Sequence, residues 1–191
     1  MIFINKNKTP EFITSFIRNN KHGNYDSESF KPYYQELRNS LIAEQKGLCA
    51  YCCTKITLDK SHNEHIEPRH KKDGTYSKRS LDYTNIVASC ERESTCGRKK
   101  GNEYDELKFI SPLMEGCEEI FSYFPDGYMD GDEYTISLLN LNSYELRRAR
   151  RAMYKILLDM DSDTIEMVYC KDNNNYISYI NVIRWFLRNM F

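Results

Sequence analysis

Four cysteines in two pairs constrain the fold of this chain more than any other feature. Cys49 and Cys52 follow shortly after Gly47 with two residues between them, and Cys90 and Cys96 come further along with five residues between them. Two thiolates at the C-x2-C spacing can reach one Zn²⁺ at tetrahedral angles from a single tight turn. The sequence therefore predicts a zinc site of four thiolates. Such a site stabilises the fold and does no chemistry, because none of its ligand positions stays open.

The cysteines also allow other interpretations. Seven is an odd number, and thiols stay reduced in the cytosol, so a disulfide framework is disfavoured. Cys53 is an alternative ligand to Cys52, although C-x2-C is the better attested spacing. Plain packing and a redox pair are further alternatives, but a redox pair usually follows a strand and opens a helix, whereas this pair follows a predicted helix. Cys117 and Cys170 are expected to be buried small hydrophobes.

Apolar spacing predicts a mainly helical α+β protein. A chain of 191 residues can form one good core, or a small core with a metal-bound module. Helices are predicted from Pro10 onwards, over about residues 29–45, over about residues 143–160, and in a last segment that holds Ile177 and Leu187. Between them, residues 49–100 contain short β-like pieces and turn residues. This central segment is therefore predicted to be a separate module in the middle of the chain.

Charge is distributed unevenly along the chain, although the net charge is only −1. Residues 69–100 contain nine basic and four acidic residues, whereas residues 101–142 contain ten acidic residues and one basic residue. A basic segment of this kind attracts phosphates. No apolar stretch approaches the length of a membrane span, and the first residues lack a secretory signal. A cytoplasmic location without a membrane partner is therefore expected.

The segment NEHIEP, residues 63–68, places Glu64 directly before His65, one of only four histidines. Phosphodiester hydrolysis needs a base for water, a cation for the charge that develops on the phosphate, and a grip on the backbone. His65 suits the role of base because imidazole titrates near working pH. Neighbours on a strand point to opposite sides unless the strand ends there, and Pro68 is consistent with such an end. The pair is therefore a candidate catalytic site.

The order of these motifs resembles that of the HNH nuclease family. The stretches LIAEQKGLCAYC, EHIEP, LDYTNIVASC, TCGRKKG, PDGYM and TISLLNLNSYELRRAR resemble the HNH subunit of Septu-type and retron-associated anti-phage systems, the PtuB-like proteins. The resemblance covers most of residues 30–155. The central motifs are specific to HNH nucleases, and the LNLN segment with its following leucine and arginine indicates the subfamily.

The resemblance implies a central zinc-bound ββα-metal (HNH) core, in which a zinc knuckle holds a hairpin against a helix. The predicted units are an N-terminal helical segment, 1–46, the HNH nuclease core, 47–106, and a C-terminal, mainly helical region, 107–191, packed as one unit with the core. Structural Zn²⁺ and a catalytic Mg²⁺ or Mn²⁺ are the implied cofactors.

The resemblance also assigns catalytic roles. His65 matches the general base, Glu64 matches the residue that binds the catalytic divalent ion, and Asn85 matches the asparagine that constrains the loop and orients the histidine by a hydrogen bond. Gly97 departs from the pattern, because the family commonly has His or Asn there as a second metal ligand. Either Glu64 holds the ion with waters and substrate oxygens, or another residue supplies the ligand, of which Asn102 and Asp105 are the nearest in sequence.

Basic residues around the catalytic pair are predicted to contact the nucleic-acid backbone, which positions the substrate without reading its sequence. DNA is the expected substrate, with RNA, including tRNA, as the alternative. His22, His62 and His70 lie off the motif and are interpreted as bystanders. The predicted backbone contacts are Arg69, Lys71, Lys72, Arg98, Lys99 and Lys100.

The predicted function is a metal-dependent HNH endonuclease. The resemblance implies that it is the effector subunit of an anti-phage system and acts with a PtuA-like ATPase partner. The acidic residues 103–133 and the C-terminal helices are the expected docking surfaces. The alternative is a zinc-stabilised nucleic-acid-binding or adaptor module that has lost catalysis, which the missing side chain at Gly97 favours.

Overall fold

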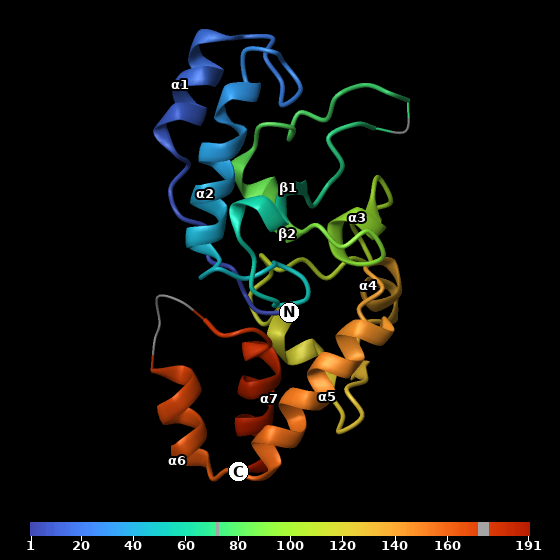
Figure 1. Cartoon of the computed structure of the whole chain (residues 1–191). Coiled ribbons are helices and arrows are strands. Elements are labelled where there is room, and N and C mark those ends of the chain that lie inside the picture. Colours follow the sequence, from blue (N-terminus) through green and yellow to red (C-terminus); the bar gives the residue numbers. More distant parts are fainter. Residues whose placement is uncertain (72, 172–175) are drawn as a thin grey trace.

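A two-stranded antiparallel hairpin followed by a short helix lies at the centre of the protein, between two groups of helices (Figure 1). Strand β1 (Ser61–His65) pairs with strand β2 (Ile86–Cys90), with Glu64 opposite Val87. Helix α3 (Cys96–Lys100) follows β2 and packs against it. The central segment therefore has the order strand, strand, helix.

The structure is a computed structural model that describes residues 1–71, 73–171 and 176–191. Within these ranges, helices combine with two small antiparallel sheets, which confirms the predicted α+β class. None of the described helices has the length and apolar character that crossing a bilayer requires.

Two helices precede the hairpin. Helix α1 (Glu11–Asn19) begins directly after Pro10, as predicted, since a proline at a helix start has no N–H to leave unpaired. Helix α2 (Tyr34–Glu44) begins later than predicted, because a 3₁₀ turn, Lys31–Tyr33, comes first. Pro32 lies in that turn, where its missing N–H and its ring disfavour a regular α-helical turn around it.

The side chain of Gln45 fixes the end of α2 to strand β2. Its Nε2 donates to the carbonyl oxygens of Leu48 and Ala88, and its Oε1 accepts from Ala88 N at 2.6 Å. All of these groups are buried, so each unmade bond would leave an unpaired polar group in the core. The hairpin is thereby held in one position against the N-terminal helices.

The region after α3, predicted to be loose, has short regular elements. A 3₁₀ turn, Cys117–Ile120, leads into a small hairpin of β3 (Ser122–Tyr123) and β4 (Met129–Asp130). Helix α4 (Glu133–Leu138) follows, and Asp132 caps it by accepting a hydrogen bond from Thr135 N.

The C-terminal helices lie at the opposite end of the molecule from α1 and α2 (Figure 1). Helix α5 (Tyr144–Leu158) matches the predicted helix over residues 143–160, and it packs against α7 (Ile180–Met190). Between them come α6 (Ser162–Ile165) and a π-helical turn, Glu166–Cys170, neither of which was predicted.

Helix α7 begins later than predicted. Tyr179 precedes it in the left-handed conformation, with φ of 64°, so Ile177 lies outside the helix. Backbone hydrogen bonds join the C-terminal region to the centre, from Tyr179 N to Cys53 O at 2.7 Å and from Cys96 N to Leu139 O at 2.8 Å. Both cysteine-bearing turns are therefore supported by the elements that follow the hairpin.

Candidate metal centre and active-site cleft

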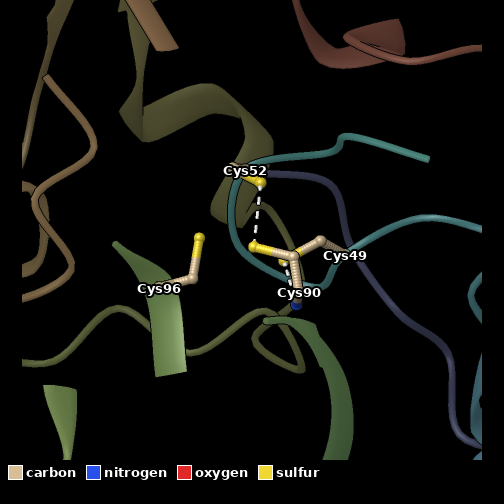
Figure 2. A group of neighbouring side chains, drawn as sticks. All are labelled: Cys49, Cys52, Cys90 and Cys96. Atoms are coloured by element: carbon tan, nitrogen blue, oxygen red, sulfur yellow. Dashed lines mark hydrogen bonds between the residues drawn. The ribbon is translucent and has the colours of Figure 1, made fainter. Parts of the chain in front are cut away.

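The four predicted zinc ligands converge. The sulfurs of Cys49, Cys52, Cys90 and Cys96 all lie within 4.8 Å of one another, and all four residues are buried (Figure 2). Thiolates around one Zn²⁺ at about 2.3 Å and tetrahedral angles stand about 3.8 Å apart. The Cys52 and Cys90 sulfurs are already 4.0 Å apart. The cluster therefore fits one zinc ion with small movements of the side chains.

The local turn explains why Cys52 is in the cluster and Cys53 is not. Cys53 N donates to Cys49 O at 3.1 Å, which closes the turn, and Cys53 itself adopts the left-handed conformation. The thiol of Cys53 is outside the cluster found in the described residues, and burial raises its pKa to about 12, which keeps it protonated. Cys117 is buried as expected, whereas Cys170 is only half-buried.

Donors surround the cluster. Cys90 N donates to Cys49 Sγ at 3.4 Å, and Arg92 Nη1 lies 3.8 Å from Cys52 Sγ. Hydrogen bonds of this kind orient thiolates and offset the negative charge that four of them carry around a divalent ion. The surroundings as well as the spacing therefore suit a metal–thiolate site.

A cleft of about 270 Å³ opens beside the cluster, along β1 and the start of α3. Glu64 and His65 both line it, so the structure brings the adjacent acidic and imidazole groups to one cavity. The other residues that line the cleft are His62, Asn63, Pro68, Arg69, Gly97, Arg98, Gly101 and Asn102.

Glu64 is nearly buried, with 7% of its surface exposed, and both carboxylate oxygens have partners. Lys100 Nζ lies 3.1 Å from Oε1, and Tyr51 donates its hydroxyl to the same oxygen at 3.5 Å. His62 Nε2 lies 3.4 Å from Oε2. Burial raises the pKa of Glu64, but the hydrogen bond from His62 and the charge of Lys100 outweigh burial and bring the pKa below its usual value. The carboxylate is therefore ionised.

His65 ends strand β1 and lines the cleft, with 5% of its surface exposed. Its Nε2 is 2.9 Å from Ser80 O, and because a carbonyl oxygen only accepts, Nε2 carries the proton and Nδ1 keeps its lone pair. The ring packs edge-on against Tyr25, with the ring centres 4.6 Å apart. Burial lowers the pKa of His65 to about 4. At neutral pH the ring is therefore an uncharged proton acceptor.

Asn85 constrains the loop, but it does not bond to His65. Its Oδ1 accepts from Glu67 N at 2.8 Å, and its Nδ2 donates to Glu67 O at 2.9 Å and to Arg79 O at 3.2 Å. The next carbonyl after Arg79 is that of Ser80, which holds His65. The predicted direct hydrogen bond is thus replaced by an indirect link, in which Asn85 fixes the backbone that orients the ring.

The predicted phosphate contacts fall into different groups. Lys99 and Lys71 are exposed, and Lys72 lies outside the described residues. Arg69 and Arg98 line the cleft, where Arg69 Nε bonds to Asp26 and Arg98 Nε bonds to Glu91 at 2.7 Å.

Lys100 is a correction to the predicted phosphate contacts. Its side chain is 0% exposed, and its ammonium group pairs with Glu64 instead of facing a groove. A group enclosed in this way is not available to a backbone phosphate. Within the run of Arg98, Lys99 and Lys100, only the first two reach the surface.

The sequence analysis interpreted His62 as a bystander, whereas the structure places it in the cleft beside Glu64. The signal was present in the sequence, because residues two apart on a strand share a face. Of the two residues considered in place of Gly97, Asn102 lines the cleft with an exposed side chain. Asp105 is engaged elsewhere, with Lys108 at 3.3 Å.

Comparison with known proteins agrees with the class that the motifs indicate. The chain is 27% identical over 179 residues to a Vibrio cholerae (serotype O1 biovar El Tor) protein described as "Retron Vc95 putative HNH endonuclease", across 83% of this chain and 84% of that protein. It is 26% identical over 133 residues to an Escherichia coli protein described as "Retron Ec83 putative HNH endonuclease", across 64% of this chain and 46% of that protein. The chain thus spans about half the length of the second relative. No protein-family model matches the chain.

These similarities support an HNH endonuclease. Both relatives are described in those words, and the first aligns along most of both chains. The assignment to the Septu or PtuB-like group has its basis in the sequence motifs alone.

Proposed function

We propose that this chain is a metal-dependent HNH endonuclease that hydrolyses nucleic-acid phosphodiester bonds, as the effector of an anti-phage system of the retron or Septu type. The observation that carries the proposal is the cleft in which Glu64 and His65 meet, beside the thiolate cluster and with Arg69 and Arg98 at its walls. The two relatives described as retron HNH endonucleases support the same class.

His65 is the proposed general base. The Nε2–H bond to Ser80 O fixes the ring, so that Nδ1 is the atom that takes the proton of an attacking water. Burial keeps the ring neutral, with a pKa of about 4. A phosphate entering the cleft brings negative charge close to the ring, which favours the protonated form and so strengthens the base when the substrate is bound. Asn85 positions His65 through the loop backbone.

Glu64 is the proposed ligand of the catalytic divalent ion, Mg²⁺ or Mn²⁺. Its Oε1 is engaged by Lys100 and Tyr51, whereas Oε2 faces the cleft side near Gly97. An ionised, oriented carboxylate oxygen at the wall of a cleft is a suitable donor for a hard cation. Such an ion, when bound, neutralises the charge that develops on the phosphate and the leaving oxygen.

The thiolate cluster is the proposed structural zinc site. Cys96 opens helix α3 and Gly97 follows it directly, so the cluster sets where α3 meets strand β1. A closed four-thiolate site contributes folding energy and leaves no position for substrate. In this proposal zinc holds the start of α3 against strand β1, the two elements between which the cleft lies.

The nucleic-acid backbone is proposed to contact Arg69, Lys71, Arg98 and Lys99, with DNA as the substrate and RNA as the alternative. Arginines at the wall of a cleft are suited to phosphate oxygens. Arg69 and Arg98 already bond to the carboxylates of Asp26 and Glu91, which orients both guanidinium groups at the cleft. The substrate would enter along this wall.

The ATPase partner is part of the proposal through the resemblance to PtuB-like proteins. The acidic residues 103–133 and the C-terminal helices are the proposed docking surfaces, and none of them is among the groups that line the cleft. Gel filtration of the chain with a PtuA-like ATPase tests this part of the proposal. Co-elution supports it, and separate elution contradicts it.

The enzyme proposal is tested with plasmid DNA and RNA incubated with purified protein in Mg²⁺ or Mn²⁺, with and without the ATPase. The variants are His65→Ala and, as a matched control, His22→Ala, which removes an exposed histidine remote in sequence from the cleft. We expect wild type and His22→Ala to cleave equally, and His65→Ala to be roughly 10²–10⁴-fold slower. Zinc content should be the same in all three.

Cleavage that is unchanged in His65→Ala, or absent from every condition with wild type, contradicts the enzyme proposal. The second candidate, a zinc-stabilised nucleic-acid-binding or adaptor module, then takes its place. The depth of His65, 5% exposed, favours that candidate. Retarded migration of DNA or RNA without cleavage is the result that it predicts.

A further inference from the structure

Gly97 stands at a point where two metal-binding groups converge. A Cβ atom added there would lie 2.6 Å from Glu64 Oε2 and 2.8 Å from His62 Nε2, both far inside van der Waals contact. The first residue of α3 after Cys96 therefore has to be glycine because of close approach. The same crowding shows that a side chain at position 97 cannot supply a ligand while Glu64 and His62 occupy their positions.

The two donor atoms are correctly spaced for one cation. His62 Nε2 and Glu64 Oε2 are 3.4 Å apart. Ligands at about 2.1 Å from a common ion, separated by octahedral to tetrahedral angles, stand about 3.0–3.4 Å apart. His62 and Glu64 are two residues apart on β1 and so share one face of the strand. The register of the strand therefore brings both donors to the same point of the cleft.

The surroundings of the two groups orient them toward that point. Lys100 and Tyr51 take Glu64 Oε1, whereas Oε2 faces Nε2 of His62, the second proposed donor. On the far side of the imidazole, His62 Nδ1 is buried and has no hydrogen-bond partner among the described residues. Glu91 Oε1 lies 3.6 Å from it, and Arg98 holds Glu91 in place.

A carboxylate behind the far nitrogen is the usual arrangement around a metal-bound histidine. In the metal-free chain His62 Nε2–H faces Glu64 Oε2, and an ion bound between these two atoms takes the place of that proton. The carboxylate behind the ring then favours the remaining imidazole proton on Nδ1. A small movement of the Glu91 side chain would close the 3.6 Å gap to Nδ1 into a hydrogen bond. The histidine, its carboxylate and Glu64 thus form a prepared donor set.

From this geometry we infer that His62 is the second protein ligand of the divalent ion at Glu64, and that the imidazole–carboxylate pair selects Mn²⁺ over Mg²⁺. The inference rests on the proposed function, because it names the ligand that the proposed catalytic ion lacks at Gly97. Imidazole suits transition-metal ions, whereas Mg²⁺ prefers oxygen donors and retains its waters. Two protein donors leave the other positions for water and phosphate oxygens.

The test measures Mn²⁺ binding by electron paramagnetic resonance of free Mn²⁺, on zinc-loaded protein without nucleic acid. The proteins are wild type, His62→Ala, His62→Asp and the control His22→Ala, with zinc content and thermal unfolding measured for each. We expect His22→Ala to bind as wild type does and His62→Ala to bind at least ~10-fold more weakly. His62→Asp, which restores an oxygen donor, should regain binding and make Mg²⁺ a stronger competitor.

Undetectable Mn²⁺ binding by wild type overturns the inference. If His62→Ala folds and binds Mn²⁺ as tightly as wild type does, the inference is also overturned. If His62→Ala does not fold, the inference is overturned when folded His62→Asp shows the same Mg²⁺ competition as wild type. The cleavage assay on the same preparations separates this inference from the proposed function. If wild type cleaves nucleic acid but Mn²⁺ binding does not depend on His62, the inference is wrong and the proposed function stands. If Mn²⁺ binding depends on His62 but wild type cleaves no nucleic acid, the proposed function is wrong and the metal site stands.

Discussion

The thiolate cluster and the Glu64 cleft both adjoin the β1–β2 hairpin, yet they are built in opposite ways. The cluster takes four like donors from the turn at residues 49–52, the end of β2 and the start of α3, and all four are buried and converge on one centre. The cleft takes unlike groups from β1, the loop after it and the start of α3, opens to solvent, and has arginines at its wall. A closed ligand set can only stabilise, whereas an incomplete one can accept water and substrate.

The difference shows how the two sites depend on each other. Cys96 and Gly97 are consecutive, and Gly97 N donates to Ser89 Oγ at 3.1 Å, within the strand that ends at Cys90. The cluster therefore fixes the distance between α3 and β1, which brings Gly97 against Glu64 and His62. Stability at one site positions the chemistry proposed for the other.

Removing zinc from the cluster should have the largest effect. Cys49→Ser takes one ligand from the closed set, and structural zinc sites contribute on the order of 10 kcal/mol to folding. We expect zinc content to fall from about one per chain and the hairpin to lose its fold, measured by metal analysis and by thermal unfolding. Cys170→Ser is the matched control, because Cys170 is outside the cluster. Equal stability of the two variants would mean that the cluster does not support the fold.

Breaking the ion pair under the cleft should have the next largest effect. Glu64→Gln leaves the ammonium of Lys100 buried without a charged partner, at a cost of about 3 kcal/mol in the free energy of unfolding. Chemical denaturation measures this change. Glu64→Gln combined with Lys100→Met should recover most of the stability and none of the Mn²⁺ binding. Recovery of binding as well would show that Glu64 is not a metal ligand.

Adding one methyl group at Gly97 should have the next effect in size, and it should act on the cleft and not on the thiolate cluster. In Gly97→Ala the new Cβ meets Glu64 Oε2 and His62 Nε2, and overpacking of this kind costs up to about 3 kcal/mol. The displaced donors should also weaken Mn²⁺ binding while zinc content stays constant. Gly101→Ala is the control, because nothing lies within 4 Å of a Cβ there; its φ of 55° costs backbone strain without touching the donors. Unchanged Mn²⁺ binding in Gly97→Ala would show that the space beside Gly97 holds no ion.

Acidification should produce the smallest effect. His65 is neutral in the folded chain because burial lowers its pKa to about 4, whereas the unfolded residue titrates near 6.5. The unfolded state therefore binds more protons, and stability falls as pH drops from about 7 to about 5, by roughly 2 kcal/mol. The measurement is chemical denaturation of wild type and His65→Gln at both pH values without divalent ions. Equal losses in the two proteins would mean that His65 is not buried as a neutral ring.

The sequence predicted the cysteine cluster because a tight turn makes C-x2-C spacing a strong geometric constraint. The apolar periodicity of residues 143–160 likewise predicted α5, since its buried face is long and regular. The β3–β4 hairpin was missed because two residues per strand are too few to show an alternating pattern. Helix boundaries shifted where single residues such as Pro32 and Tyr179 changed the backbone.

Some residues of the candidate site were predicted correctly from the sequence and others were not. Glu64 and His65 do share a cleft, but Lys100 was expected at the surface because a basic run usually is solvated. Its burial depends on the Glu64 carboxylate, a pairing between distant parts of the chain that sequence spacing does not encode. His62 was not predicted because it lies outside the Glu64–His65 motif, although residues 62 and 64 share one face of the strand. Gly97, which looked like a lost ligand, is required by the close approach of those two groups.

The most direct test is anomalous diffraction from crystals of the zinc-loaded protein grown with Mn²⁺. The account predicts two separate peaks, one at the zinc edge among the four sulfurs and one from manganese between His62 Nε2 and Glu64 Oε2. A manganese peak away from Glu64, or zinc bound at the cleft with the thiolate cluster empty, would contradict it.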